Sequence, residues 1–362
     1  MKGLQMTVRI GFRVDANEHV ATGHLMRCMT IANECKAMGM ECRFYLAEDK
    51  MTEKLRENAF PYTVLGTSWE QLHSEIHQMQ EQVRKDDLHW LIVDTYQADA
   101  KYLEELNDVC NVMYIDDFAE TVYSIAAILH YSYLKNDTET EQLYQGKNTS
   151  VLAGADYIPI RKEFWDVDKK QRSQAVLVTT GGTDPLGITQ IILKMKNRYP
   201  ILKDYTFHVL VGKMNQFTDE LESLEHMDDS IILHKNINNV GDYMRLCQCA
   251  ISAGGTTLYE LCACQTPTIC FSFADNQREF VDCMGKEGIM LSVGDARDDG
   301  WSGTRIMNAL VKMIEQPELR NTYIEKMKGL VDRKGTIRIA EFLMESISNS
   351  KFSIDNHFSN IV

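Results

Sequence analysis

Strand-like and helix-like segments alternate along most of the 362-residue chain, and this alternation limits the fold to a few architectures. In the first half, the strand-like apolar runs are 8–15, 41–48, 62–66, 88–96 and 111–118. In the second half they are 174–182, 205–212, 230–237, 249–255, 267–273 and 288–294. Parallel strands need a crossover connection, usually a helix, between them. The alternation therefore predicts an α/β fold of parallel sheets with helices on both faces.

The chain is longer than one hydrophobic core usually holds, so two domains are expected. The expected boundaries are 1–160 for an N-terminal Rossmann-like domain, 161–345 for a C-terminal one, and 346–362 for a tail. The segment 150–172, with its charged run DVDKKQR, is the expected linker. Two doubly wound domains facing a cleft are the simplest arrangement. Two C-terminal helices are expected over about 305–330 and 335–348, and the second is a candidate to cross back over the junction.

Composition argues against several classes of function. The net charge of −14 is unlike that of a nucleic-acid-binding surface, although a few arginines and backbone amides suffice for a phosphate. No apolar run approaches the roughly 18–20 residues that span a bilayer. The N-terminal sequence MKGLQMTVRIGF has no signal-peptide pattern. We therefore expect a cytoplasmic protein without a membrane segment; composition does not predict its oligomeric state.

The ten cysteines do not have the spacing of a metal site. Cys247/Cys249 and Cys262/Cys264 form C-x-C pairs, without the paired C-x-x-C motifs of a zinc ribbon. In a reducing compartment, such cysteines are expected to be reduced and structural. We expect neither a metal nor a cofactor.

Polar residues gather where the predicted strands end. These positions are 15–27, 94–96, 116–117, 181–184, 252–260 and 275–277. In parallel sheets, ligands bind beyond the carboxyl ends of the strands. Asp94, Asp116 and Asp117 have the alternative role of helix caps. The strand ends are nevertheless the first place to look for a site.

The stretch ISAGGTTLYE offers a candidate phosphate site. A strand ends at Ser252, and Gly254 and Gly255 permit close approach of the backbone to a ligand. A helix opening at Thr256 or the next residue has free N–H groups that favour a phosphate. Glu260, about one turn in, can accept hydrogen bonds from both hydroxyls of a ribose. The alternative is an ordinary tight turn whose acidic residue is favoured by the helix dipole alone.

The stretch TTGGTDP is a second glycine turn after a strand. Gly181 and Gly182 are candidates for ligand contact, whereas its threonine and aspartate are candidates for helix caps. The spacing fits neither a Walker loop nor a dinucleotide G-x-G-x-x-G motif.

The stretch GHLMR lies where the first strand gives way to a helix. Gly23 permits an unusual backbone angle or a close approach, and His24 falls near the helix N-cap, where its imidazole can act as a base toward water. Asp15 is a candidate to orient that imidazole or receive its proton. Arg27, one turn on, has two open roles, contact with a phosphate or pairing with an acid. The alternative for His24 is a simple cap or surface residue.

Together these motifs resemble a known family. The Asp15-to-GHLMRC stretch, VDTY, IDD at 115–117, GGTDP, SAGGTTLYE and ADNQ occur in this order over nearly the whole chain. They resemble the UDP-sugar hydrolase PseG and its spore-coat relative SpsG. The resemblance implies the GT-B fold of glycosyltransferases such as MurG. Two stretches differ from the family pattern: D-T-Y at 94–96 replaces the usual D-H-Y, and FAETVYSIAAILHYSYLKND follows IDD where relatives commonly carry a histidine and an N-x-N run.

The resemblance also implies an activity. This is hydrolysis of UDP-2,4-diacetamido-2,4,6-trideoxy-β-L-altropyranose to UDP and the free sugar, on the route to pseudaminic acid. It implies that His24 activates the attacking water with inversion, that Glu260 holds the uridine ribose and that Asn276 contacts the substrate, without a metal. Tyr96, in VDTY, and Arg161, in the expected linker, complete the candidate substrate-binding residues. The alternatives are a GT-B glycosyltransferase with a UDP-sugar donor and a nucleotide-sugar-binding protein without catalysis.

Overall fold

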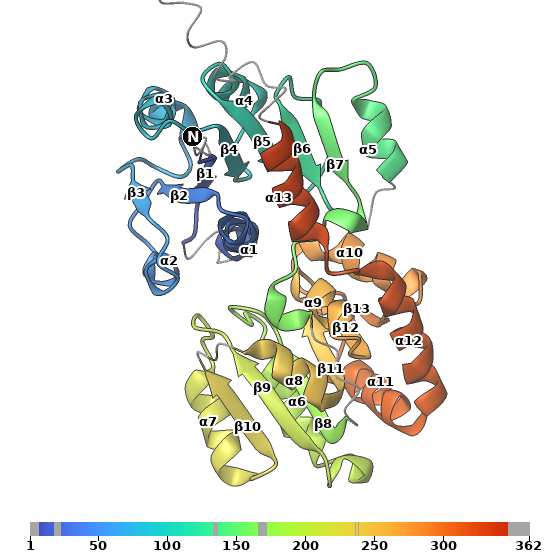
Figure 1. Ribbon diagram of the computed structural model, residues 1–362. Helices are drawn as coiled ribbons and strands as arrows, with labels where there is room; N and C mark the ends of the chain where they lie inside the picture. Colours follow the sequence, from blue (N-terminus) through green and yellow to red (C-terminus); the bar gives the residue numbers. More distant parts are fainter. Residues whose placement is uncertain are drawn as a thin grey trace, which may run out of the picture. The chain divides into compact units, whose positions relative to one another are not determined.

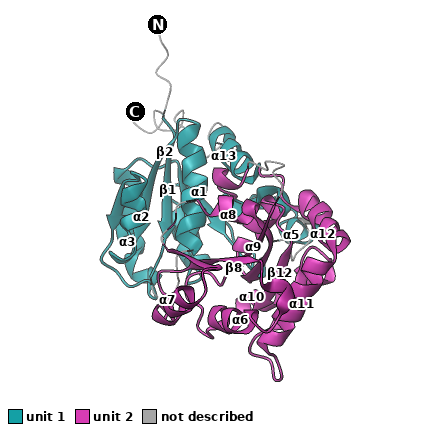
Figure 2. Cartoon of the chain, turned by 90° about the horizontal axis from the view of Figure 1, so that it is seen from below, with its two compact units in different colours: residues 1–159, 334–362 teal, residues 160–333 magenta. Residues whose placement is uncertain are grey.

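The computed structural model describes residues 7–17, 23–132, 137–165, 172–235, 237 and 239–346. The chain divides into two compact units (Figure 2). Unit 1 comprises Met1–Pro159 and Lys334–Val362, and unit 2 comprises Ile160–Arg333. Each unit has its own parallel sheet.

Unit 1 contains a seven-stranded parallel sheet of order β3-β2-β1-β4-β5-β6-β7 (Figure 1). Its strands are β1 (Arg9–Val14), β2 (Glu41–Leu46), β3 (Tyr62–Val64), β4 (Trp90–Asp94), β5 (Asn111–Ile115), β6 (Ala127–His130) and β7 (Ser150–Ala153). The chain builds outward from β1 in one direction and then returns to add β4 on its other side. This is the Rossmann order, in which ligands bind at the reversal between the first and fourth strands.

Helices cover both faces of this sheet. They are α1 (Gly23–Ala37), α2 (Glu53–Glu57), η1 (Leu72–Glu75), α3 (Ile76–Lys85), α4 (Ala100–Asn107), α5 (Asp137–Leu143), η2 (Ala155–Tyr157) and α13 (Gly335–Glu345). Alternate residues of β4 show why both faces need cover. Leu91 and Val93 join the core under α3 and α4, whereas Trp90 meets Phe342 of α13 at a ring-centroid distance of 5.6 Å. A strand buried on both faces reads as a continuous apolar run, which is the pattern of 88–96.

The last helix packs on unit 1, which differs from the expected boundary at residue 345. Besides the contact of Phe342, α13 lies against α1 and η2. Gly335 allows this approach, since a Cβ there would lie 2.2 Å from the carbonyl oxygen of Ile158. Of the expected tail 346–362, residues 347–362 lie outside the described part of the chain.

Two further expectations about elements are corrected. The segment 150–172 is not wholly a linker, because its first four residues form β7 at the edge of the sheet. The helix expected over about 305–330 is two helices, α11 (Gly303–Glu315) and α12 (Pro317–Leu330). Pro317 has no N–H to continue the first helix and suits the first turn of the second.

Unit 2 contains a six-stranded parallel sheet of order β10-β9-β8-β11-β12-β13, again the Rossmann order. Its strands are β8 (Ser173–Thr179), β9 (Thr206–Val211), β10 (Ile231–Lys235), β11 (Cys247–Ala253), β12 (Thr268–Ser272) and β13 (Leu291–Asp295). Besides α11 and α12, its helices are η3 (Lys162–Phe164), α6 (Ile188–Lys196), η4 (Pro200–Leu202), α7 (Thr218–Met227), α8 (Val240–Leu246), α9 (Thr257–Ala263) and α10 (Asp275–Lys286). The reversal here lies between β8 and β11.

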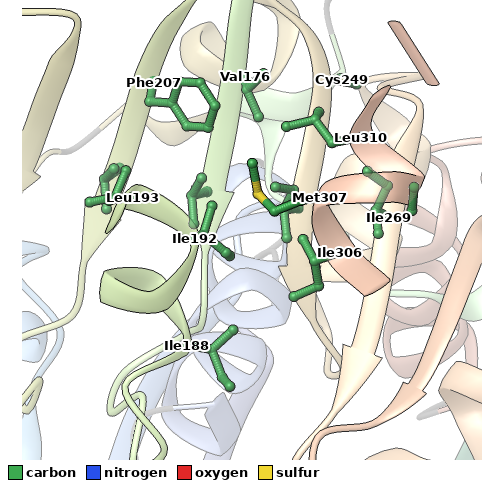
Figure 3. Close-up of a cluster of buried hydrophobic side chains, with 14 of the residues drawn as sticks. Val176, Ile188, Ile192, Leu193, Phe207, Cys249, Ile269, Ile306, Met307 and Leu310 are labelled. Atoms are coloured by element: carbon green, nitrogen blue, oxygen red, sulfur yellow. The ribbon is translucent and has the colours of Figure 1, made fainter. Parts of the chain in front are cut away.

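A core of unit 2 lies between its sheet and helices that include α6 and α11 (Figure 3). Strand residues such as Val176 and Phe207 meet Ile192 of α6 and Met307 of α11, and all four are completely buried. None of the ten cysteines, all of which lie in the described ranges, forms a disulfide bond, and nine are buried. Within the described ranges, no helix is long and apolar enough to cross a membrane.

Candidate active site

An aspartate–histidine pair stands at the strand reversal of unit 1. His24 is in the first turn of α1, which follows β1, and Asp94 ends the adjacent strand β4. The two buried side chains meet with 2.5 Å between His24 Nδ1 and Asp94 Oδ1. Asp94 therefore does not cap a helix, the alternative that the sequence left open.

The charge of Asp94 fixes the tautomer of His24. Burial alone would raise the pKa of the Asp94 carboxyl, but Arg27 and His24 outweigh burial and hold that pKa well below its usual range. An ionised carboxylate only accepts hydrogen bonds, so His24 Nδ1 carries the proton that is donated to it. The lone pair then lies on Nε2, which makes no hydrogen bond within the described part of the chain. This is the arrangement of a general base.

Arg27 pairs with acids, which decides between the two roles that the sequence left open. Its Nε and Nη2 donate to the two carboxylate oxygens of Asp94 at 2.7 and 2.6 Å. Its Nη1 donates to Asp117 at 2.7 Å and to the Tyr131 hydroxyl at 2.8 Å. All three nitrogens of the guanidinium are engaged by the protein, so Arg27 serves to hold the carboxylates and not to meet a phosphate.

Tyr96 lies beside the histidine, as its place after β4 predicts. Its ring stands edge-on to that of His24, with centroids 4.6 Å apart. Its hydroxyl donates to Asp117 at 2.8 Å. Burial and the nearby Asp117 raise the pKa of the Tyr96 hydroxyl, which keeps it a neutral donor.

Asp15 does not orient His24, so that expectation is wrong. Its carboxylate pairs with the buried Arg13 at 2.8 Å and accepts a hydrogen bond from the amide of Ala47. Arg13 also pairs with the buried Glu75 at 2.6 Å. The sequence signal for Asp94 as the partner of His24 was available, since VDTY follows a strand that the Rossmann order places beside the first.

Gly23 begins α1 without an unusual backbone angle. A Cβ at Gly23 would meet no atom within 4 Å, so the packing of the described residues does not demand glycine there. Residues 18–22, between β1 and α1, lie outside the described part of the chain.

In unit 2, the glycine turn after β11 leaves backbone amides available. Gly255 has a φ of +136°, a conformation that favours glycine, and opens into free space. The amides of Gly255, Thr256 and Thr257 donate no hydrogen bond to the described residues. Glycine is needed at position 254 for a different reason: a Cβ there would lie 2.8 Å from the side chain of Val281 on α10. Ser252 is buried and donates to the carbonyl of the next residue.

Glu260 stands on α9 just beyond those amides and is held by Arg161. Arg161 Nη2 donates to Glu260 Oε1 at 3.0 Å, and the same guanidinium pairs with Glu163 and lies over the Phe164 ring. Burial raises the pKa of the Glu260 carboxyl; Arg161 opposes this rise and Glu163 adds to it. The structure thus brings together two residues that the sequence proposed separately.

The GGTDP turn after β8 caps a helix, which is one of the two roles that the sequence proposed for it. Asp184 accepts hydrogen bonds from the amides of Ile188 and Thr189 at 2.9 and 3.0 Å, so it caps α6 and occupies that helix start. Gly181 and Gly182 remain exposed at the strand reversal, and Gly181 has a φ of +77°.

Asn276 is an exposed residue in the first turn of α10. Strand β12, which leads to α10, pairs with β11, and Gly254 packs on α10 at Gln277. Asn276 therefore lies at the same edge of the sheet as the glycine turn. In the described part of the chain, no group of three histidine, cysteine or acidic side chains is arranged to hold a metal ion.

Two Rossmann-like units in one chain define the GT-B class of fold, and solved structures of that class match this chain. Acinetobacter baumannii MurG is 10% identical, with a TM-score of 0.62 over 93% of this chain and 99% of its own. Staphylococcus aureus MnaA, solved with UDP, is 12% identical, with a TM-score of 0.62 over 95% of this chain and 97% of its own. The predicted fold class is confirmed.

Relatives by sequence confirm the resemblance drawn from the motifs. The Bacillus subtilis spore coat polysaccharide biosynthesis protein SpsG is 21% identical over 93% of this chain and 98% of its own length. The Campylobacter jejuni UDP-2,4-diacetamido-2,4,6-trideoxy-β-L-altropyranose hydrolase is 21% identical over 78% and 97%. The chain spans only 58% of a Methanocaldococcus jannaschii relative that is 23% identical. No family model matches the chain.

Proposed function

We propose that this chain hydrolyses a UDP-linked 2,4-diacetamido-2,4,6-trideoxy hexose to UDP and the free sugar. We place the reaction in the cytoplasm, in the biosynthesis of pseudaminic acid or a related surface or spore-coat polysaccharide. The observation that carries the proposal is the His24–Asp94 pair with the free Nε2. The name of the hydrolase relative supplies the substrate class, and the name of SpsG supplies the link to polysaccharide biosynthesis.

The proposed reaction begins with a water molecule next to His24 Nε2. As the water oxygen bonds to the anomeric carbon, its proton passes to Nε2. The bond from the anomeric carbon to the UDP oxygen breaks, and UDP leaves with the bonding electrons from the opposite face. The free sugar therefore has the inverted configuration. Asp94 stabilises the imidazolium that forms, and Arg27 keeps that carboxylate ionised and in place.

The residues of unit 2 supply the proposed nucleotide site. The amides of Gly255, Thr256 and Thr257 are suited to the pyrophosphate, whose departure they would ease by stabilising its charge. Glu260 would accept hydrogen bonds from the ribose hydroxyls, with Arg161 fixing its carboxylate. The exposed Gly181 and Gly182 and the amide of Asn276 complete the set of proposed contacts.

A GT-B glycosyltransferase is the second candidate, because MurG and the rhamnosyltransferase SpnG share the fold. The same histidine can deprotonate an acceptor hydroxyl as readily as water. The experiment is to incubate the protein with a panel of UDP-sugars without an acceptor, following UDP release by phosphorus NMR and the free sugar by proton NMR. UDP release with formation of one free anomer supports hydrolysis. Release only after an acceptor is added supports transfer, and binding without turnover supports a non-catalytic protein.

A further inference from the structure

Two aromatic side chains are exposed side by side at the carboxyl edge of the unit 1 sheet. Tyr96 is 47% exposed and Phe118 is 50% exposed, and their ring centroids lie 5.5 Å apart. Among the exposed large hydrophobic side chains of the described residues, these are the only aromatic ones. We call the pair the aromatic shelf. Contiguous exposed apolar surface is a feature of ligand-binding sites.

Hydrogen bonds to two aspartate carboxylates hold the aromatic shelf in place. The Tyr96 hydroxyl donates to Asp117, whose carboxylate is fixed by Arg27. The backbone amide of Phe118 donates to the buried Asp116 carboxylate at 3.0 Å. These polar contacts anchor the far end of one ring and the backbone of the other. They therefore keep apolar surface in contact with water, which costs free energy unless a ligand covers it.

The shelf adjoins the proposed base. The Tyr96 ring meets the His24 ring edge-on at 4.6 Å, so the shelf continues outward from the histidine. A sugar whose anomeric carbon is attacked by water held at Nε2 has its ring within reach of these aromatic faces. Aromatic faces suit the C–H surface of a pyranose and an attached methyl group, whereas a hydroxyl pressed onto them loses hydrogen bonds to water.

We infer that the aromatic shelf binds the apolar face of a 6-deoxy hexose, and that Phe118 makes the site prefer a 6-methyl over a 6-hydroxymethyl group. This rests on the proposed function in taking a UDP-sugar as the ligand. It assigns Phe118 a role in specificity that neither the motifs nor the relatives indicated. Discrimination of this kind in an apolar site is about tenfold or more.

The test compares two UDP-sugars that differ only at carbon 6, UDP-N-acetylglucosamine and its 6-deoxy counterpart, UDP-N-acetylquinovosamine. Dissociation constants are measured by calorimetry for the wild type and for Phe118→Ala. We expect the wild type to bind the 6-deoxy sugar about tenfold tighter, and Phe118→Ala to lose most of that preference. UDP itself should bind both proteins equally. Phe118→Tyr should restore the preference, and Leu143→Ala, at an exposed apolar position on α5, should not alter it.

Dissociation constants test the aromatic shelf, and UDP release tests hydrolysis. Either proposal can therefore be contradicted without the other. Loss of the preference in Phe118→Ala supports the shelf even if the panel of UDP-sugars shows no release of UDP, which would count against hydrolysis. An unchanged preference in a folded Phe118→Ala overturns the shelf, as does a wild type that binds both sugars equally, whether or not hydrolysis occurs. Circular dichroism melting of each variant establishes that it is folded.

Discussion

At the scale of single residues, the proposed chemistry depends on the carboxylate of Asp94. It accepts hydrogen bonds from His24 and Arg27 together, and the positive charge of Arg27 keeps it ionised despite its burial. Neither partner would be placed correctly without it. His24 would lose the acceptor that selects its tautomer, and Arg27 would lose the carboxylate that accepts from its Nε and Nη2.

Asp94→Asn tests this role while keeping the shape of the side chain. An amide can donate to His24 Nδ1, which moves the ring proton to Nε2 and removes the base. We expect kcat for UDP release to fall about 10³- to 10⁴-fold, with little change in the Kd for UDP. Asp87→Asn, at an exposed carboxylate paired with Arg9, is the matched control and should leave kcat unchanged. A kcat within threefold of the wild type for Asp94→Asn would rule out the role.

The same carboxylate makes stability depend on pH. Because the pKa of Asp94 is lower in the folded than in the unfolded state, ionised Asp94 stabilises the fold above its ordinary pKa of about 4. That contribution is lost progressively as pH falls below this value. Urea unfolding at pH 7 should show Asp94→Asn less stable by about 3 kcal/mol, and the difference should shrink as the pH is lowered below about 4. A difference that is constant from pH 7 to 3 would contradict the account.

At the scale of elements, the start of α9 couples the proposed ribose site to pH. Burial and Glu163 raise the pKa of Glu260, and Arg161 opposes them. As pH falls through that raised pKa, the carboxylate gains a proton and can no longer accept hydrogen bonds at both oxygens.

UDP affinity should therefore weaken at acid pH, and Arg161→Met should move this weakening to higher pH. Calorimetric Kd values for UDP over a pH series test the shift. Glu260→Gln is the control. In this variant the phosphate of UDP still titrates, whereas the side chain at position 260 does not. If the wild type and Glu260→Gln show the same pH dependence, Glu260 does not hold the nucleotide.

Much of the element order could be predicted from the sequence, because buried parallel strands are continuous apolar runs separated by helical patterns. The exceptions have physical causes. Strands β6 and β7, with four residues each, were not predicted, whereas the three-residue β3 was, because Pro61 and Gly66 mark its ends. The partner of His24 depends on which strands are neighbours: Asp94 is 70 residues away in sequence and reaches His24 only because β4 lies beside β1. Arg27 could bind either a phosphate or an acidic side chain, and the sequence alone does not show which of these groups lies near it.

At the scale of the whole molecule, the C-terminal segment belongs to the same compact unit as the N-terminal segment. Helix α13 follows unit 2 in sequence and packs on α1 of unit 1, so unit 1 is built from two separate segments. Cutting the chain at the expected boundary near residue 160 would therefore remove the helix that packs on α1 and on Trp90 of β4.

Leu343→Ala tests this assignment. Leu343 is fully buried on α13, and its truncation should cost about 2–5 kcal/mol. Hydrogen exchange followed by mass spectrometry should show faster exchange in β4 and α1, with unit 2 little affected. Met327→Ala, at a fully buried position on α12, is the matched control and should loosen unit 2 instead. Faster exchange confined to unit 2 for Leu343→Ala would contradict the division.

The central claim is that His24 directs water to the anomeric carbon of a UDP-sugar. The most direct measurement uses the UDP-sugar that the panel shows to be hydrolysed fastest, in water enriched in oxygen-18, with wild type and His24→Gln compared before the free sugar equilibrates its anomers. We predict oxygen-18 in the sugar and none in UDP, a single inverted anomer, and a His24→Gln rate at least about 100-fold lower at an unchanged Kd for UDP. Oxygen-18 in UDP, or a His24→Gln rate equal to that of the wild type, would contradict the claim.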